Sequence, residues 1–397
     1  MPATVSIMPT FEELDAITLA DLQATGATKW SRGSDLIGAF VAEMDFGIAA
    51  PITRRLHREV DRAAFGYLPR DLKAEMREAT TAFLRERTGW EVDPRDVHEM
   101  PDVIAVLQAV MDSFTRPGAK IIVPTPAYMP FLSVPGLRGR EVIEVEMLTD
   151  TDGTYRYDLA GIEAAFDAGG ELLVLCNPHN PTGRVFTRGE LEEVAALVDR
   201  KGGRVFSDEI WMPLTLSGDH LPYADLSETA ASHTITAVAA SKAFNLPSLK
   251  CAQLITSSLA DRTHWERVGH MPMHGAANLG VAATSTAYAE GGPWLDDIRS
   301  YLRRNRDRLI ELVDQLLPRA QLTTMEGTYI AWLDLRDYAV EGSMRAFLRD
   351  HAGVECTDGT ECGTAWGGFI RFVYATPRPL MTEAITRIAR ALDDATR

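Results

Sequence analysis

Short apolar runs alternate with amphipathic segments through the middle of the chain. Runs rich in branched apolar residues occur at Lys120–Pro124, Glu171–Cys176, Arg204–Asp208 and Thr234–Ala239. Between two of these runs, the spacing of apolar positions at Arg188–Gly202 predicts an amphipathic helix. Because strands that alternate with helices form a parallel sheet covered on both faces, we expect an α/β fold with a mostly parallel sheet.

The pattern changes after Gly291-Gly292-Pro293. Beyond this break the sequence predicts an α+β unit with helices at Trp294–Leu317, at Gly342–Ala352 and from Thr382, and strands at Tyr329–Leu335 and Phe369–Val373. At the other end, Thr10 followed by Glu13 has the form of a capping box and predicts one short helix over Thr10–Leu22. We therefore expect an N-terminal arm that forms part of the small domain (1–45), a large domain (46–290) and a small C-terminal domain (291–397).

Composition narrows the class of protein. The chain has 397 residues, of which 46% are hydrophobic, and this size favours two domains. A formal net charge of −16 without a basic run argues against nucleic acid and anionic membranes as partners. The sequence begins without a signal-peptide pattern and has no apolar stretch of the ~18–20 residues that a membrane span needs, so we expect a cytoplasmic location. Four cysteines without a Cys-x-x-Cys pair predict free thiols.

Three polar segments follow apolar runs and carry the candidate chemistry. They are Asn177–Gly183, Ser207–Ile210 and the Ser241-Lys242 pair. The carboxyl ends of parallel strands meet at the edge where such sheets bind ligands, so we expect these segments to meet. A lysine amine forms a Schiff base, a carboxylate can face a ring nitrogen, and an asparagine can bind a ring hydroxyl. The sequence therefore predicts a site for pyridoxal 5′-phosphate, in which these three roles belong to Lys242, Asp208 and Asn180.

Other residues suit the remaining parts of that cofactor. The hydroxyl of Ser241 and the ammonium group of Lys250 suit its phosphate, as do the backbone N–H groups of Val103 and Ile104 at a predicted helix start. Tyr128 is placed to stack on the ring. Each residue also has a plainer interpretation: Lys242 and Lys250 as surface lysines, Asp208 as a helix cap, and Tyr128 as packing.

Arg371 lies inside an apolar strand, where arginine is rarely buried unpaired. A bidentate clamp on a substrate carboxylate and a structural salt bridge explain it equally well from the local sequence. The nine histidines form no convincing metal set, so we expect no metal site.

These segments resemble the fold-type I pyridoxal phosphate enzymes of the aspartate aminotransferase superfamily. Within it the chain resembles the MalY/PatB-like branch of cystathionine β-lyases, or carbon–sulfur lyases. The matching segments run over nearly the whole chain: Val41–Phe46, Phe65–Tyr67, Thr125–Tyr128, Cys176–Gly183, Ser207–Ile210, Ser241–Pro247, Gly292–Leu295 and Thr328–Asp334.

The resemblance implies a homodimer with shared active sites, in which Tyr67 reaches the partner's cofactor phosphate. It implies β-elimination that cleaves a C–S bond, with Lys242 taking the α-proton and Tyr128 beside it as a second catalytic residue. It further implies that a small-molecule amino-acid substrate contacts Arg371, Asp45 and Trp211.

Several positions depart from the branch on the side where the substrate is expected. Glu43 stands where aspartate is usual, Trp211 where the lyases carry histidine, and Val373 where asparagine is usual. Two further reactions therefore stay open. One is that of a class I/II aminotransferase. The other is γ-elimination, replacement or cyclisation in specialised metabolism, with a bulky substrate such as S-adenosylmethionine.

Overall fold

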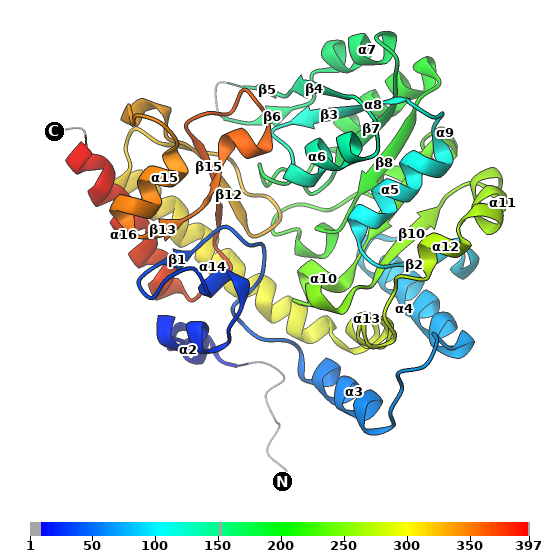
Figure 1. The fold of residues 1–397 in the computed structure, drawn as a ribbon, viewed down its shortest axis with the longest axis horizontal. Coiled ribbons are helices and arrows are strands. Elements are labelled where there is room, and N and C mark those ends of the chain that lie inside the picture. The colour runs from blue at the N-terminus through cyan, green and yellow to red at the C-terminus, as the bar shows by residue number, and fades with distance from the viewer. Residues whose placement is uncertain (1–8, 151–152, 396–397) are drawn as a thin grey trace.

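A seven-stranded sheet forms the core of the larger lobe of the molecule (Figure 1). The computed structural model describes residues 9–150 and 153–395. The strand order is β2 (Val97–Met100), β10 (Ala252–Thr256), β9 (Thr234–Val238), β8 (Arg204–Asp208), β7 (Gly170–Cys176), β3 (Lys120–Thr125) and β4 (Val142–Glu146). β10 runs in the opposite direction to the other six strands of this sheet. The predicted mostly parallel sheet is confirmed, and its four predicted strands start within one residue of the expected positions.

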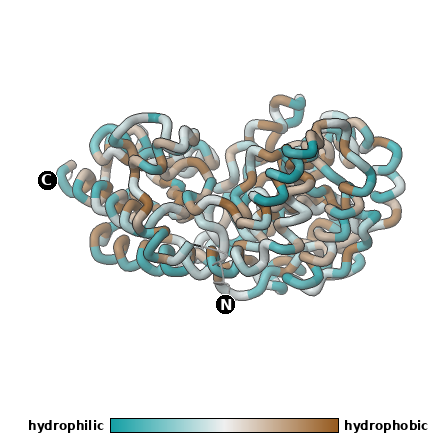
Figure 2. Tube along the Cα trace, turned by 90° about the horizontal axis from the view of Figure 1, so that it is seen from below, coloured by the Kyte–Doolittle hydropathy of each residue, from teal (hydrophilic) through white to brown (hydrophobic). Residues whose placement is uncertain are grey.

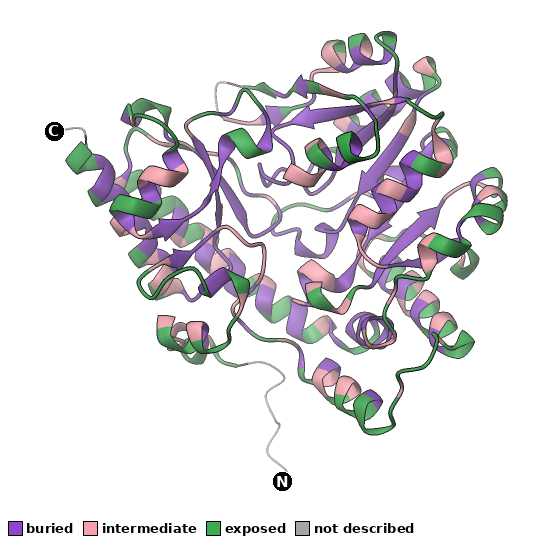
Figure 3. Ribbon diagram, in the orientation of Figure 1, coloured by how far each residue is buried: buried purple, intermediate pink, exposed green. Residues whose placement is uncertain are grey.

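The sheet is buried on both faces because its side chains alternate between two apolar clusters. Ile121 and Val123 of β3 belong to one cluster, and Ile122 belongs to the other. Helix α5 (Val103–Phe114) contributes to the first cluster, and α7 (Leu159–Asp167) and α8 (Arg188–Lys201) to the second. Figure 3 shows the strands as buried and the outer faces of the helices as exposed. The helix predicted at Arg188–Gly202 is therefore present as α8.

A smaller antiparallel sheet forms from the C-terminal part of the chain. Its order is β11 (Gln321–Leu322), β12 (Ile330–Asp334), β15 (Phe369–Val373) and β14 (Thr357–Asp358). The long helix α14 (Gly292–Leu316) packs against α16 (Arg378–Ala395) beside it. The N-terminal segment joins this part, since β1 (Ile37–Gly38) pairs with β13 (Val354–Glu355). Figure 2 shows the resulting two lobes side by side.

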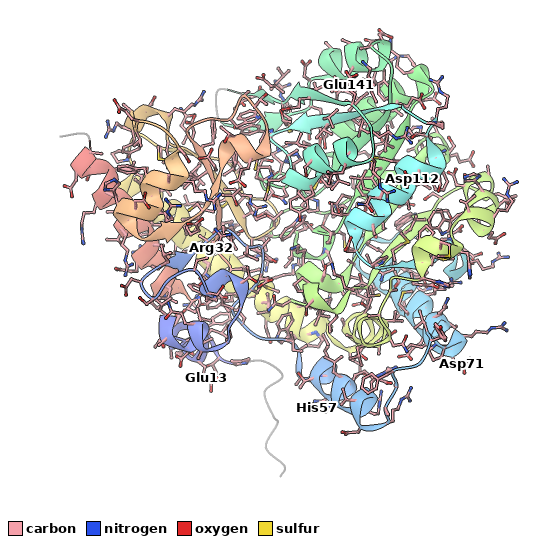
Figure 4. The ribbon with its side chains drawn as sticks, in the orientation of Figure 1. Glu13, Arg32, His57, Asp71, Asp112 and Glu141 are labelled. Carbon is pink, nitrogen blue, oxygen red and sulfur yellow. The ribbon has the colours of Figure 1, made fainter. Side chains whose placement is uncertain are left out.

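The remaining elements lie around these two sheets. They are α3 (Ala50–Asp61), α4 (Arg70–Thr88), α6 (Met129–Leu137), β5 (Leu148–Thr149), β6 (Tyr155–Arg156), α9 (Glu228–Ser232), α10 (Ala240–Ala243), α11 (Leu259–Val268), α12 (His270–Met273) and α13 (Asn278–Glu290). Figure 4 shows Glu13, His57 and Asp71 at the outer edge of the molecule. No helix in the described ranges is long and apolar enough to cross a membrane.

Two predicted helices differ in the structure. The single helix predicted over Thr10–Leu22 is wrong, because the segment forms α1 (Phe11–Asp15) and α2 (Leu19–Ala24). Thr18 and Asp21 make a second capping box, which starts a new helix inside the predicted one. The helix predicted at Gly342–Ala352 begins later, as α15 (Met344–Phe347), and continues as a wider π-helical turn. The four cysteines are free, as predicted, and the structure places all four in buried positions.

Candidate active site

A cavity of about 530 Å³ lies at the carboxyl ends of the central strands. Three chain segments leave β7, β8 and β9 at this edge and carry Asn180, Asp208 and Lys242 into the cavity. Helix α5 begins at the cavity, and β15 of the small sheet contributes Arg371. The cavity brings together ten of the residues singled out in the sequence: Val103, Ile104, Tyr128, Asn180, Asp208, Trp211, Ser241, Lys242, Lys250 and Arg371.

Lys242 lies in the one-turn helix α10 directly after β9. Its Nζ donates a hydrogen bond of 2.9 Å to the carbonyl oxygen of Ala42 and lies 5.8 Å from the ring centre of Trp211. Burial lowers the pKa of the lysine to about 8, and the positive charge of Arg371 acts in the same direction. A larger share of the amine is therefore neutral near pH 8 than in an exposed lysine, and the neutral amine is the form that attacks an aldehyde.

Asp208 ends β8 and is only 3% exposed. One carboxylate oxygen accepts a hydrogen bond from the backbone N–H of Ile210 at 3.1 Å. No cation of the described ranges lies within ion-pair distance of this carboxylate, and burial raises its pKa to about 7. A protonated ring nitrogen placed against Asp208 would supply the missing positive partner.

Arg371 is 2% exposed and lacks a carboxylate partner among the described residues. Its Nη2 donates to the carbonyl oxygen of Phe40 at 2.8 Å and its Nη1 to Oδ1 of Asn180 at 3.4 Å, whereas its Nε has no partner there. A buried guanidinium is costly unless a charged partner compensates it. Within the described ranges no residue makes the structural salt bridge considered from the sequence, and the cavity leaves room for the carboxylate of a ligand.

The start of α5 and Lys250 form the cationic end of the cavity. Asp102 caps the helix by accepting from the N–H of Ala105, which leaves the N–H groups of Val103 and Ile104 without an intrahelical acceptor. Nζ of Lys250 lies 3.0 Å from the carboxylate of Asp102. Free N–H groups at a helix start and a nearby ammonium group suit a phosphate.

Tyr128 lines the same cavity just before α6. Its ring packs edge-on against Phe131 at 5.5 Å between ring centres. Burial raises the pKa of its hydroxyl, so the phenol stays protonated at neutral pH.

Two residues singled out in the sequence lie outside the cavity. Asp45 binds Nζ of Lys29 at 2.7 Å and Nε1 of Trp30 at 2.8 Å, so both carboxylate oxygens already have partners. The structure thus gives Asp45 a role in holding the N-terminal segment, because its partner Lys29 is buried. Tyr67 is fully exposed on the connection between α3 and α4.

Sequence reasoning missed two groups beside Lys242. The carbonyl oxygen of Ala42 accepts from both Lys242 and the hydroxyl of Tyr329, each at 2.9 Å. A backbone carbonyl leaves no side-chain signal that a pattern could reveal. Tyr329 belongs to a segment used for the resemblance, where a polar aromatic residue beside apolar strand positions was the available signal.

Comparisons with known proteins agree with this geometry. The family model for aminotransferase class I and II matches residues 43–388. A cystathionine beta-lyase from Corynebacterium glutamicum is 35% identical over 94% of this chain and 99% of its own length. Cystathionine beta-lyase PatB from Bacillus subtilis (strain 168) is 30% identical over 93% of this chain and 97% of its own length. Cystalysin from Treponema denticola, whose crystal structure contains pyridoxal 5′-phosphate, is 27% identical, with a TM-score of 0.86 and coverage of 93% and 96% of the two chains.

The chain belongs to the aminotransferase class I and II family. Its α/β fold is the fold-type I fold of pyridoxal phosphate enzymes, as predicted, and the predicted resemblance to the MalY/PatB-like branch is confirmed. The cavity also fits that cofactor on structural grounds. It offers a lysine amine, a buried carboxylate without a cation, and a helix start with an adjacent ammonium group.

Proposed function

We propose that this protein is a pyridoxal 5′-phosphate-dependent lyase that breaks a carbon–sulfur bond of an amino acid by β-elimination. The observation that carries the proposal is the cavity, which combines Lys242, Asp208 and the unpaired, buried Arg371. The reaction type is supported by two relatives that match over nearly their whole length and are named cystathionine beta-lyases.

Each residue has a distinct task in this proposal. Arg371 binds the α-carboxylate of the substrate and so places the α-carbon near Lys242. Lys242 would hold the cofactor through Nζ, and the same amine would remove the α-proton of the substrate. Asp208 would keep the ring nitrogen protonated, and the side-chain amide of Asn180 would donate a hydrogen bond to the ring hydroxyl. When bound, the cofactor supplies an electron sink for the electron pair left at the α-carbon.

The remaining residues position the cofactor and exclude water. The phosphate of the cofactor binds at the cationic end of the cavity, which is formed by Val103, Ile104, Ser241 and Lys250. Tyr128 packs against the ring, and its protonated phenol can donate a proton near the departing sulfur. Trp211 closes the side of the cavity next to Lys242.

A second copy of the chain completes the assembly in this proposal. Phe65 is 65% exposed and Tyr67 fully exposed on one connection, although apolar rings gain by burial. The connection is held at Gly66, because the side-chain amide of Asn278 donates to the carbonyl of Gly66 at 2.7 Å. A connection that presents two aromatic rings suits a homodimer interface, with Tyr67 directed towards the partner's cofactor phosphate.

Product analysis tests the proposed reaction. The protein loaded with cofactor is incubated with an S-alkyl-L-cysteine and, separately, with L-cystathionine, and pyruvate, ammonia and thiol are measured. Equal amounts of the three products from at least one substrate are expected. Amino transfer to an added 2-oxo acid without pyruvate would instead identify an aminotransferase, and a γ-cleavage product would identify γ-chemistry.

A further inference from the structure

Each charged residue that lines the cavity either pairs with another charged residue or has a role that does not involve the leaving group of the substrate. They are Asp102, Asp208, Lys242, Lys250 and Arg371. Asp102 and Lys250 pair with each other at the cationic end. In the proposed function, on which this inference rests, Asp208 faces the ring nitrogen, Lys242 the α-carbon and Arg371 the α-carboxylate. Among the described residues that line the cavity, no charged side chain is left for a second charged group of the substrate.

The main chain of Phe40–Ala42 indicates the side of the cavity on which the leaving group of the substrate would lie. Nη2 of Arg371 binds the carbonyl oxygen of Phe40 at 2.8 Å, and Nζ of Lys242 binds that of Ala42 at 2.9 Å. The two groups that hold the α-carboxylate and take the α-proton are thus anchored two residues apart on one segment. The β-carbon of a substrate bound between them would lie beside this same segment.

Several apolar side chains line the cavity. Val41 lies between the two anchoring carbonyls, the ring centre of Trp211 lies 5.8 Å from Nζ of Lys242, and Met129 and Ile210 also line the cavity. Trp211 is 1% exposed and packs edge-on against Tyr329 at 4.7 Å between ring centres. The hydroxyl of Tyr329 donates to the carbonyl of Ala42, and this hydrogen bond holds the ring against which the indole packs.

Glu43 is a charged residue beside this wall that does not line the cavity. It directly follows Ala42, and its negative charge acts on Lys242 and Tyr329. Its carboxylate could attract a cationic leaving group, so the test below includes it.

We propose that the leaving-group side of the cavity accepts an uncharged, apolar thiol, so that the preferred substrates are S-alkyl- or S-aryl-L-cysteines. In the reaction the C–S bond breaks, the sulfur takes up a proton and leaves as the thiol, and water supplies the keto oxygen of pyruvate as ammonia is released. A thioether whose leaving half carries its own ammonium and carboxylate groups would bury two charges against apolar walls, which is unfavourable. An alkyl chain gains about two- to fourfold in affinity for each buried methylene.

Two matched pairs of compounds test the preference on the enzyme loaded with cofactor. S-butyl-L-cysteine has the four leaving carbons of L-cystathionine without its charges, and we expect its kcat/KM to be at least tenfold higher. L-norleucine and L-lysine differ only in the terminal ammonium group. From changes in the visible absorbance of the holoenzyme, we expect the Kd of L-norleucine to be at least tenfold lower, without any turnover.

Variants of the wall and of Glu43 complete the test. Trp211→His should reduce the preference for S-butyl-L-cysteine over L-cystathionine at least fivefold, whereas Trp211→Phe should retain it. Turnover of L-cystathionine that equals or exceeds that of S-butyl-L-cysteine would overturn the inference and leave the lyase proposal standing. Loss of that turnover in Glu43→Gln would assign the recognition of the charged leaving group to Glu43. Absence of pyruvate from every thioether would overturn both.

Discussion

Burial sets the reactivity of Lys242 more strongly than any single neighbouring charge. The pKa of this amine is lowered to about 8, first by burial and then by Arg371, whereas Glu43 and Asp208 act in the opposite direction. Protonated amine does not attack an aldehyde, so cofactor uptake should follow the neutral fraction of Lys242. We expect the rate of uptake by the apoprotein to rise about tenfold per pH unit below pH 8 and to level off above it.

Stopped-flow absorbance during addition of pyridoxal 5′-phosphate measures this rate. Replacing Arg371 by Gln removes a positive charge, and the levelling should then occur at higher pH. A rate that rises steadily to pH 10 in the unmodified protein would show that the amine behaves as an exposed lysine.

Arg371 binds substrate in our proposal and does not hold the fold together. Since Arg371 has no carboxylate partner among the described residues, Arg371→Gln should raise KM about 30- to 100-fold through loss of charge-assisted hydrogen bonds, while the melting temperature stays near that of the unmodified protein. Arg184 is the matched control, because it is also buried but pairs with Glu190 at 2.7 Å. Arg184→Gln should lower the melting temperature and leave KM nearly unchanged. The reverse pattern would assign Arg371 a structural role.

At the scale of elements, helix α13 supports the loop that carries Lys250. A Cβ added to Gly280 of this helix would lie 1.9 Å from the carbonyl oxygen of Leu249, next to Lys250. Gly280→Ala should therefore destabilise the protein by about 1–3 kcal/mol through overpacking, and it should weaken cofactor binding by displacing the loop. Urea unfolding and a cofactor titration measure the two effects.

Gly189 of helix α8 provides the control for this substitution. A Cβ there meets nothing within 4 Å, so Gly189→Ala should be neutral or stabilise by up to about 1 kcal/mol. Equal stability of the two variants would contradict the support that we assign to α13.

Local sequence predicted the elements that carry a strong periodic signal. The apolar runs at β7, β8 and β9 and the amphipathic α8 were located closely, because each is buried as its own pattern requires. The N-terminal helix was wrong because one capping signal was used and the second, at Thr18, was overlooked. The antiparallel placement of β10 depends on contacts between distant segments, which a local pattern does not contain.

The same distinction holds for the site. Residues that follow parallel strands were predictable, because the fold itself brings strand ends together. Asp45 was assigned to the substrate, and the structure places it against Lys29, a partner that its own sequence neighbourhood does not reveal. The unpaired state of Arg371 depends on every side chain around it, so the choice between clamp and salt bridge required the structure.

At the scale of the whole molecule, the proposed dimer shares its two sites between copies. If Tyr67 of one copy serves the cavity that holds Lys242 of the other, a heterodimer of Tyr67→Ala and Lys242→Ala subunits contains one intact site. Random mixing of the two inactive or weakened variants should therefore restore about one quarter of the unmodified activity. Subunit exchange followed by a pyruvate assay measures the recovery. Activity equal to the sum of the separate variants would show that each site belongs to one chain.

Two lysines line the cavity, and the central claim requires that Lys242 alone holds the cofactor. Borohydride reduction of the holoenzyme fixes the lysine-bound cofactor in place, and peptide mass spectrometry then identifies the modified residue. We predict one modified lysine per chain, at Lys242. Modification of Lys250 in its place, or of no lysine in a protein that demonstrably contains the cofactor, would contradict the claim.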